Sequence, residues 1–399
     1  MYRLKLLFIF LTFFAVSCGG DGGPAAPDPD PDPNPDPEPT TGTIEITTQT
    51  TGKDKDDSYT ITADGTNNTS ADSSDTVYLT DLEEGSYEMQ LSDIAQNCSV
   101  DGDNPRSVSV TAGDTTATSF NVQCKAVIKN RIAFTSDRAG SLGIYIMNPD
   151  GSSQEPLISS SDVENFPSIS PSGTRIAYGK APSGTDNYQL YVADVDGSNE
   201  TALTSGTGGG QTIFSSWSPD GKKIAFTTER GGNFEVYTMN ADGSEQTNIS
   251  RSDSLDGIYT SSWSPDGNKI LFFSRRGQGT DFEIYVGNTD GSGLVQLTDD
   301  SYQNSYPAWS PDGSKIAFMS ERDGDSEIFV MNDDGSGVIQ LTNNAVQDVV
   351  PSWSPDGTEI SFVREEANFE VYKINADGSG PETNLTSHPS EDVWPNWSH

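Results

Sequence analysis

A phrase close to Trp-Ser-Pro-Asp-Gly recurs along the second two-thirds of this chain at intervals of 44 to 48 residues. The chain ends at the start of one more copy, Trp397-Ser398. A fixed period in this range indicates a repeat architecture whose units stack against their neighbours. The five copies, the first with Ser-Pro-Ser-Gly, are at Ser170–Gly173, Trp217–Gly221, Trp263–Gly267, Trp309–Gly313 and Trp353–Gly357.

Each unit predicts four short antiparallel strands, as in one blade of a β-propeller. The strands of a typical unit are separated by Pro-Asp-Gly, by a polar loop and by a second Asp-Gly turn. Glycine supplies a positive φ in such turns, and aspartate caps its own turn. The four predicted strands of this unit are Tyr306–Ser310, Lys315–Ser320, Glu327–Asn332 and Ile339–Thr342.

The two ends of the repeat region, residues 130–399, predict how the ring closes. The region opens on a second strand, Arg131–Ser136, and ends on a first strand, Trp394–Ser398. It holds six outer Asp-Gly turns but only five complete Ser-Pro-x-Gly turns. We therefore expect the C-terminal strand to complete the first blade of a six-bladed β-propeller, which leaves the ring without an open edge.

Residues 41–125 predict a small β-sandwich, so the fold class is all-β throughout. Short alternating segments are separated by Gly, Asp and Asn clusters, which is typical of sandwiches. The region resembles prealbumin-like and carboxypeptidase-regulatory-like domains, which implies a spacer; a carbohydrate or protein contact is the alternative. The predicted strands are Thr43–Thr48, Tyr59–Thr62, Val77–Leu79, Tyr87–Leu91, Val108–Val110 and Phe120–Val122.

The N-terminus predicts export and a lipid anchor. Residues 1–17 combine Arg3 and Lys5 with an apolar run too short to span a bilayer, as in a secretory signal. Ala15-Val16-Ser17-Cys18 resembles the bacterial lipobox, which implies acylation of Cys18; an ordinary cleaved signal with a spare thiol is the alternative. Residues 18–40 continue from the cysteine into Pro24–Pro39, where proline stands at nearly every second position and Asp at many of the others, and they should form an extended tether. Gly19-Gly20 lacks the Asp of inner-membrane retention signals, which favours the outer membrane.

The three cysteines are consistent with an exported protein. If Cys18 is acylated, Cys98 and Cys124 remain as an even pair in an exported protein. Exported proteins form and keep disulfides, so we predict that these two cysteines are bonded.

The formal charge of −38, from 22 Lys+Arg against 60 Asp+Glu, restricts the partners. Nucleic acid and anionic lipid headgroups are excluded on electrostatic grounds, so the membrane is reached only through the lipid anchor. Loose Ca²⁺ binding or a basic partner is compatible with this charge, as is adaptation to a salty habitat.

The repeats resemble the unit of TolB-type β-propellers, with Trp-Ser-Pro-Asp-Gly, then Ile-Ala-Phe, then an Asp-Gly turn and Leu-Thr. This resemblance covers about two-thirds of the chain. It implies a six-bladed ring and contacts with a protein or peptide at the cell envelope. A β-sandwich stands where TolB carries an α/β domain, so the resemblance does not extend to a role in the Tol system.

Two sets of polar residues are candidates for a binding site. A basic residue follows most second strands, and an acidic or amide residue stands three positions before the first-strand proline. Propeller topology places both loops on one face, so we expect them to ring one mouth of the central channel. The alternative is a lattice of ion pairs that tie blade to blade. The basic set is Arg138, Lys180, Arg230, Arg276, Arg322 and Arg364; the second set is Glu164, Asn304, Asp348 and Asp392, with Thr212 and Ile258 in that position of the third and fourth blades.

The repeated tryptophans could stack on sugars, but Ile169 replaces one of them, which favours packing between blades. No catalytic residue, metal site or cofactor is predicted, because the two histidines, His388 and His399, lack partners at ligand spacing. There is also no Gly-x-Ser-x-Gly elbow, and the glycine-rich residues 205–210 do not match a phosphate-binding loop. We expect a non-enzymatic binding scaffold; the alternatives are a glycan- or divalent-cation-binding propeller and a polysaccharide lyase.

Overall fold

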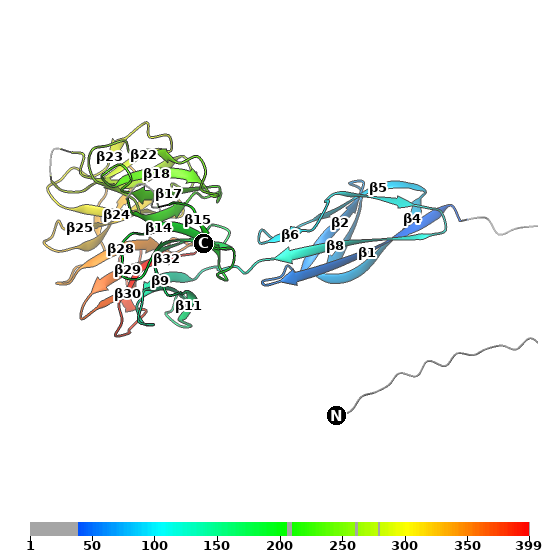
Figure 1. The fold of residues 1–399 in the computed structure, drawn as a ribbon, viewed down its shortest axis with the longest axis horizontal. Coiled ribbons are helices and arrows are strands. Elements are labelled where there is room, and N and C mark those ends of the chain that lie inside the picture. The colour runs from blue at the N-terminus through cyan, green and yellow to red at the C-terminus, as the bar shows by residue number, and fades with distance from the viewer. Residues whose placement is uncertain (1–38, 206–209, 260–261, 278–279, 399) are drawn as a thin grey trace, which may run out of the picture.

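The computed structural model describes residues 39–205, 210–259, 262–277 and 280–398 (Figure 1). The predicted signal segment, the lipidation site Cys18 and nearly all of the tether lie outside these residues. Within the described part of the chain, no helix is long and apolar enough to cross a membrane. The named elements are all β-strands, which confirms the predicted all-β class.

The first domain is a sandwich of two four-stranded sheets. Their inward faces carry alternating apolar side chains, such as Ile44 and Ile46 from one sheet and Ile61 and Met89 from the other, which form one core. One sheet has the order β4-β1-β8-β6 and the other β3-β2-β5-β7. The strands are β1 (Thr41–Gly52), β2 (Ser58–Ala63), β3 (Asn67–Asp72), β4 (Ser74–Glu83), β5 (Gly85–Ser92), β6 (Cys98–Val100), β7 (Arg106–Val110) and β8 (Thr115–Cys124).

Two of these strands, β3 and β6, were not expected from the sequence. The first is almost entirely polar, and the second is only three residues long, so neither shows an apolar alternation. Strand β6 pairs with the end of β8, where Cys98 stands opposite Cys124. The two cysteines form a disulfide, which confirms the predicted bond.

Six further four-stranded sheets follow, and they form the six blades of a propeller, numbered here in chain order. Blade 1 contains β9 (Ile132–Ser136), β10 (Gly143–Met147), β11 (Glu155–Ile158) and β32 (Asp392–Trp397); blade 2 contains β12 (Val163–Ile169), β13 (Arg175–Ala181), β14 (Gln189–Asp194) and β15 (Thr201–Ala202); blade 3 contains β16 (Thr212–Trp217), β17 (Lys223–Thr228), β18 (Glu235–Asn240) and β19 (Thr247–Asn248).

The remaining three blades repeat the same order of strands. Blade 4 contains β20 (Asp256–Gly257), β21 (Lys269–Ser274), β22 (Glu283–Asn288) and β23 (Val295–Gln296); blade 5 contains β24 (Asn304–Trp309), β25 (Lys315–Ser320), β26 (Glu327–Asn332) and β27 (Ile339–Gln340); blade 6 contains β28 (Asp348–Trp353), β29 (Glu359–Glu365), β30 (Phe369–Asn375) and β31 (Thr383–Asn384).

The two ends of the repeat region meet in blade 1. Strand β32 pairs antiparallel with β9, with Asp392 opposite Ser136 and Trp397 opposite Ile132. The backbone N–H of Ser398 also donates to the carbonyl of Arg131 at 2.8 Å. The last described strand of the chain therefore supplies the innermost strand of the first blade.

The connection from the sandwich enters the ring beside this junction. Lys125 forms an ion pair with Asp194 of blade 2 at 3.0 Å, and the N–H of Ile128 donates to the carbonyl of Gly173 at 2.8 Å. Ile128 is buried in the core between blades 1 and 2.

A group of six side chains, which we call the plug, fills the central channel. One residue from each blade contributes, and Trp394 contacts four of the other rings with centroid distances of 5.0 to 6.1 Å. Five of the six residues have positive φ values of 46 to 62°, within a bulge of the first strand. A positive φ is costly for aromatic and β-branched side chains, and here the bulge turns them toward the axis. The plug consists of Phe166, Phe214, Tyr259, Tyr306, Val350 and Trp394.

Candidate functional site

The five Ser-Pro-x-Gly turns of blades 2 to 6 lie side by side at one end of the propeller. Each turn glycine has a φ of 67 to 73°, so the turn requires glycine. A Cβ placed on Gly267 would lie 3.8 Å from Cδ of Pro219, and one on Gly313 would lie 3.3 Å from Cδ of Pro265. The turns of blades 3 to 6 therefore pack on the proline of the preceding blade, whereas the turn of blade 2 packs on Val127 and Ile128 of the connecting segment.

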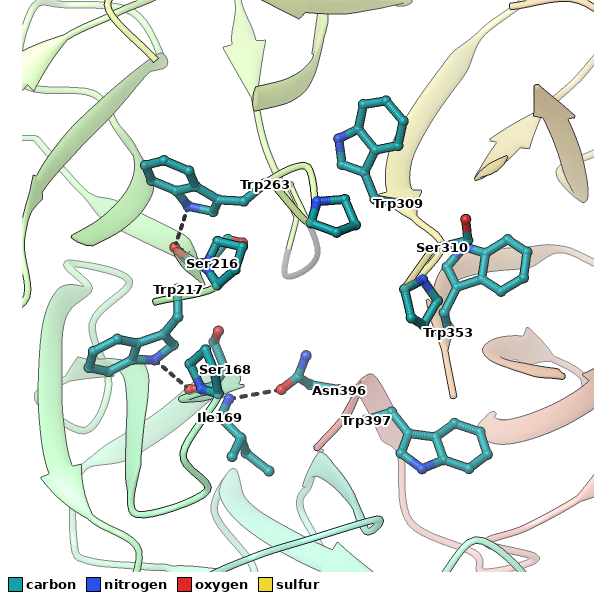
Figure 2. Close-up of a pocket in the computed structure, with 14 residues that line it drawn as sticks. Ser168, Ile169, Ser216, Trp217, Trp263, Trp309, Ser310, Trp353, Asn396 and Trp397 are labelled. Carbon is teal, nitrogen blue, oxygen red and sulfur yellow. Dashed lines mark hydrogen bonds between the residues drawn. The ribbon is translucent and has the colours of Figure 1, made fainter. Parts of the chain in front are cut away.

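The repeated tryptophans join neighbouring blades, as packing between blades predicts. The indole N–H of Trp217 donates to the carbonyl of Ser168 at 3.1 Å, and that of Trp263 donates to Ser216 at 3.0 Å (Figure 2). Trp353 bonds the preceding blade in the same way at 3.1 Å. The five rings are only 2 to 6% exposed, so their faces are not open for stacking on sugars.

The turns border a cavity of about 260 Å³, which we call the funnel (Figure 2). Indole edges and prolines make up most of the wall, and a few neutral polar side chains complete it. Among the lining residues that the structure describes, none has a charged or imidazole side chain. The lining residues are Ser168, Ile169, Pro171, Ser216, Trp217, Pro219, Trp263, Pro265, Trp309, Ser310, Pro311, Trp353, Asn396 and Trp397.

Blade 4 is irregular where it lines the funnel. Seven positions separate Asp256 from Trp263, whereas five separate Asp348 from Trp353, so its first strand contains two additional residues. The strand is reduced to β20 and a single bridge between Trp263 and Ile270. Beside it, the buried indole N–H of Trp309 has no hydrogen-bond partner among the residues that the structure describes.

The predicted polar set lies at the opposite ends of the first strands from the funnel. Along β28, Asp348 comes first, Val350 of the plug follows, and Trp353 of the funnel comes last. The plug therefore separates the polar residues from the cavity. Glu164, Asn304, Asp348 and Asp392 are each 0% exposed, so they do not line an open channel mouth as we expected.

The alternative expectation, ion pairs that tie blade to blade, is also wrong. Arg138 and Asp392 pair at 2.8 Å within blade 1, and Arg364 and Asp348 pair at 2.6 Å within blade 6. These side chains meet because the first and second strands of one blade are direct neighbours. In blade 2 the corresponding pair is looser, with Lys180 3.9 Å from Glu164.

The basic members of the set also cover an aromatic pair on their own blade. The guanidinium of Arg138 lies 4.9 Å from the ring centroid of Tyr145 and 5.2 Å from that of Phe134. Arg230, Arg276, Arg322 and Arg364 repeat this arrangement. Each stack is a cation–π contact, and in blades 1, 4, 5 and 6 it adds to an ion pair of the same arginine.

Burial is the largest cause of the pKa shift in two of these carboxyl groups. It raises the pKa of Asp392 and of Asp256 above the usual range, although Arg138 and Arg276 oppose the shift. For Arg364, burial lowers the pKa, but the hydrogen bonds to Asp348 and Glu382 outweigh it and hold the pKa above its ordinary value.

In the fourth blade, the residue that was placed in the acidic position by spacing is wrong. Asp256, not Ile258, occupies the acidic position, because Asp256 stands opposite Ser274 and pairs with Arg276 at 2.7 Å. The two-residue insertion moved Ile258 into the expected spacing. Thr212 does occupy the position in blade 3, where it faces Thr228 and where Arg230 bonds Gln246.

Blade 5 contains a group of carboxylates that could hold a metal ion by spacing alone. One oxygen from each of Asp323, Asp325 and Glu327 lies within 4.8 Å of the others. However, Glu327 accepts hydrogen bonds from Thr342 and Asn344. Burial also raises the pKa of Glu327 to about 7, so this carboxyl is only partly ionised near neutral pH.

We expect the protonation of Glu327 to shape the stability profile. Between the ordinary value of 4.5 and about 7, the folded chain keeps a proton that the unfolded chain releases, so stability falls as pH rises in this window. Glu327→Gln cannot ionise and should flatten this part of the profile, measured by urea unfolding at several pH values. Glu321→Gln, at an exposed position of the same blade, is the control; an equally steep fall in Glu327→Gln would contradict the assignment.

The sequence showed the tryptophans and turns of the funnel but not the cavity that they enclose. The plug was missed entirely, although a signal exists. An apolar residue precedes the first-strand proline in Phe166-Pro167, Tyr306-Pro307, Val350-Pro351 and Trp394-Pro395.

Comparison with known proteins supports the fold. A family model described as the TolB beta propeller domain matches residues 167–306 and 281–399. The crystal structure of TolB from Acinetobacter baumannii is similar with a TM-score of 0.58 and 22% identity, covering 79% of this chain and 80% of that one. A chain of the nidogen/laminin complex gives a TM-score of 0.54 at 9% identity, covering 67% and 98%. At these identities the likeness shows the fold alone.

An uncharacterized protein of Agrobacterium fabrum is 32% identical over 102 residues. The match covers 24% of this chain and spans about a third of the relative's length, 35%.

Proposed function

Because this chain belongs to the TolB beta propeller domain family, we propose that it is a non-enzymatic scaffold of the cell envelope that binds a peptide segment of a protein partner. The funnel is the proposed site. It is a preformed concave cavity with a mostly apolar wall and a few polar groups, which are the usual features of a binding pocket.

The lining of the funnel supports binding rather than catalysis. Its described residues offer the hydroxyls of Ser168, Ser216 and Ser310 and the amide of Asn396, and none of them has a carboxylate, imidazole or amine that could act as a base. Three of these polar groups are already engaged. Asn396 accepts the N–H of Ile169 at 2.8 Å, and Ser216 accepts that of Ser262 at 3.1 Å. The hydroxyl of Ser310 donates to Asp312 at 2.6 Å. The funnel should therefore recognise mainly an apolar side chain.

The buried indole faces favour a peptide over a glycan. Sugar recognition by stacking needs an open aromatic face, and each of the five rings is at most 6% exposed. An apolar side chain needs only a cavity of matching size. The polar set at the other ends of the first strands is not included in the proposed site, because its carboxylates are buried and paired within their blades.

The proposed location follows from the N-terminal sequence. A signal segment, acylation of Cys18 and an Asp/Pro tether would hold the sandwich and the propeller away from the outer membrane. Two acyl chains or more are needed for a stable anchor, which diacylation at Cys18 would supply.

Blocking the funnel tests the proposed function. Pro265→Tyr places a ring at the mouth from an exposed lining position, whereas Asn268→Tyr adds the same ring to the same turn at an exposed position outside the lining. We expect peptides selected from a random library on the wild-type chain to lose at least about tenfold in affinity for Pro265→Tyr, equivalent to roughly 1.4 kcal/mol. Their affinity for Asn268→Tyr should be unchanged.

Two results would contradict the proposal. Selected peptides that bind both tyrosine variants equally would place the site elsewhere on the molecule. Failure to select any binder against the wild-type chain would argue against peptide recognition, and turnover of polyuronates with added divalent metal would instead favour the lyase alternative.

A further inference from the structure

Four exposed carboxylates stand at the rim of the funnel. Asp220, Asp266, Asp312 and Asp356 each follow a turn proline, and three of those prolines line the cavity. Because each of these turns packs on the preceding proline, the four acids follow one another around blades 3 to 6. Ser172 occupies this position in blade 2, and the rim there carries a hydroxyl in place of a carboxylate.

The turns hold these carboxylates in place. In Asp266, Oδ1 accepts the hydroxyl of Ser264 at 2.5 Å and the N–H of Asn268 at 3.1 Å. Asp220, Asp312 and Asp356 accept the equivalent bonds from their own turns. A side chain fixed by two local bonds loses little further entropy when it binds a cation.

The same hydrogen bonds keep the rim ionised. The hydroxyl of Ser264 and the amide of Asn268 lower the pKa of Asp266 to about 2, and the bonds in the other turns lower the pKa of Asp220, Asp312 and Asp356. The four groups therefore carry negative charge at any pH near neutrality.

The lysines that begin the next strands are directed away from the rim. Nζ of Lys223 lies 3.5 Å from Oδ1 of Asn240, and Nζ of Lys315 lies 2.6 Å from Oδ1 of Asn332, at the ends of third strands. Lys222 approaches Asp220 at 3.6 Å, but both side chains are exposed and such pairs contribute little. In blade 4, the charge of Lys269 contributes to the lowered pKa of Asp266, so the rim charge over blades 5 and 6 is the part left for a partner.

A neutral apolar cavity with an anionic rim defines the chemistry of its ligand. We propose that the funnel binds an extended peptide segment in which an apolar side chain enters the cavity and flanking lysine or arginine side chains meet the rim aspartates. This inference rests on the proposed function and adds the charge class of the partner.

Three synthetic peptides test the inference with the full chain. Each has a central tryptophan between leucines, and the flanking residues are lysine, glutamine or glutamate. By isothermal titration calorimetry, we expect the lysine peptide to bind about tenfold more tightly than the glutamine peptide, as two to three exposed ion pairs would provide, and the glutamate peptide to bind most weakly. Added salt should reduce this preference.

The outer turns provide a matched control. Asp242, Asp290, Asp334 and Asp377 also cap their own turns, where each accepts the backbone N–H of the serine two positions later, but they lie at the outer hairpins of blades 3 to 6. We expect the quadruple rim variant D220N/D266N/D312N/D356N to lose the preference for lysine and to keep its affinity for the glutamine peptide. The outer variant D242N/D290N/D334N/D377N changes the net charge equally and should keep the preference. Asparagine retains the Oδ1 acceptor, so both variants should fold, which thermal unfolding checks.

The outcomes separate the two proposals. Equal loss of preference in both quadruple variants would assign it to the overall negative field and overturn the rim assignment, as would an unchanged rim variant. If the glutamine peptide binds the wild-type chain but not Pro265→Tyr, the funnel remains a peptide site whatever the rim does. If none of the three peptides binds the wild-type chain, both proposals are rejected.

Discussion

A chain that ends at Glu391 is expected to lose the cooperative unfolding transition of the whole propeller. The truncation removes β32, which is the only innermost strand not continuous with its own blade in the sequence. Strand β9 would then expose an unpaired edge, Arg138 would lose the buried carboxylate of Asp392, and the plug would lose Trp394. Because each blade is stable only between two neighbours, the damage should spread around the ring.

Differential scanning calorimetry would measure this effect with an internal reference. The sandwich has its own core and disulfide, so its transition should persist in the truncated chain. Adding a synthetic peptide of residues 392–398 should restore the propeller transition, which separates loss of the strand from a general effect of truncation. A truncated chain that unfolds like the full one would show that ring closure does not stabilise the propeller.

The second large effect is expected at the buried ion pair of blade 6. Asp348 is 0% exposed and Arg364 is 8% exposed at the side chain, and two hydrogen bonds of 2.6 and 2.7 Å join them. Asp348→Asn leaves the guanidinium with only the partly exposed Glu382 as an anionic partner. Removing one member of a buried pair typically costs about 3–5 kcal/mol in the free energy of unfolding.

A double-mutant cycle would isolate the pair. Arg364→Met should be similarly destabilising, because it leaves the Asp348 carboxylate buried without its cation, and the double variant should recover part of the loss. Asp300→Asn in blade 5 is the matched control, since Asp300 pairs with Arg322 at 3.1 Å at a more exposed position and should cost less than about 1 kcal/mol. Equal losses in blades 5 and 6 would mean that burial does not govern these pairs.

The features predicted correctly from the sequence are those with local causes. The strands Lys315–Ser320 and Glu327–Asn332 agree with the structure residue by residue, because Pro-Asp-Gly and polar loops fix their ends. The number of repeats predicted the number of blades, because each repeat forms one four-stranded sheet. The cysteine pair was predictable because only two candidates remain once Cys18 is assigned to the anchor.

The features that were missed depend on contacts between distant parts of the chain. Counting back from the tryptophan placed Ile258 in the acidic position, because an insertion inside a strand does not change its apolar pattern. The alternative expectation placed the Arg–carboxylate pairs between blades, because the spacing of residues in the sequence does not show which neighbouring strand a side chain faces. The funnel and the plug arise only when six first strands converge on one axis.

The junction of the connecting segment with blade 1 has a mechanical consequence. Any tension that reaches the propeller through the sandwich arrives at Ile128 and then at β9, which lies between β10 and β32. Because the force would run along these strands, it loads their hydrogen bonds in shear, so that several must rupture together. A partner held in the funnel could therefore be pulled against the membrane without peeling the ring open one bond at a time.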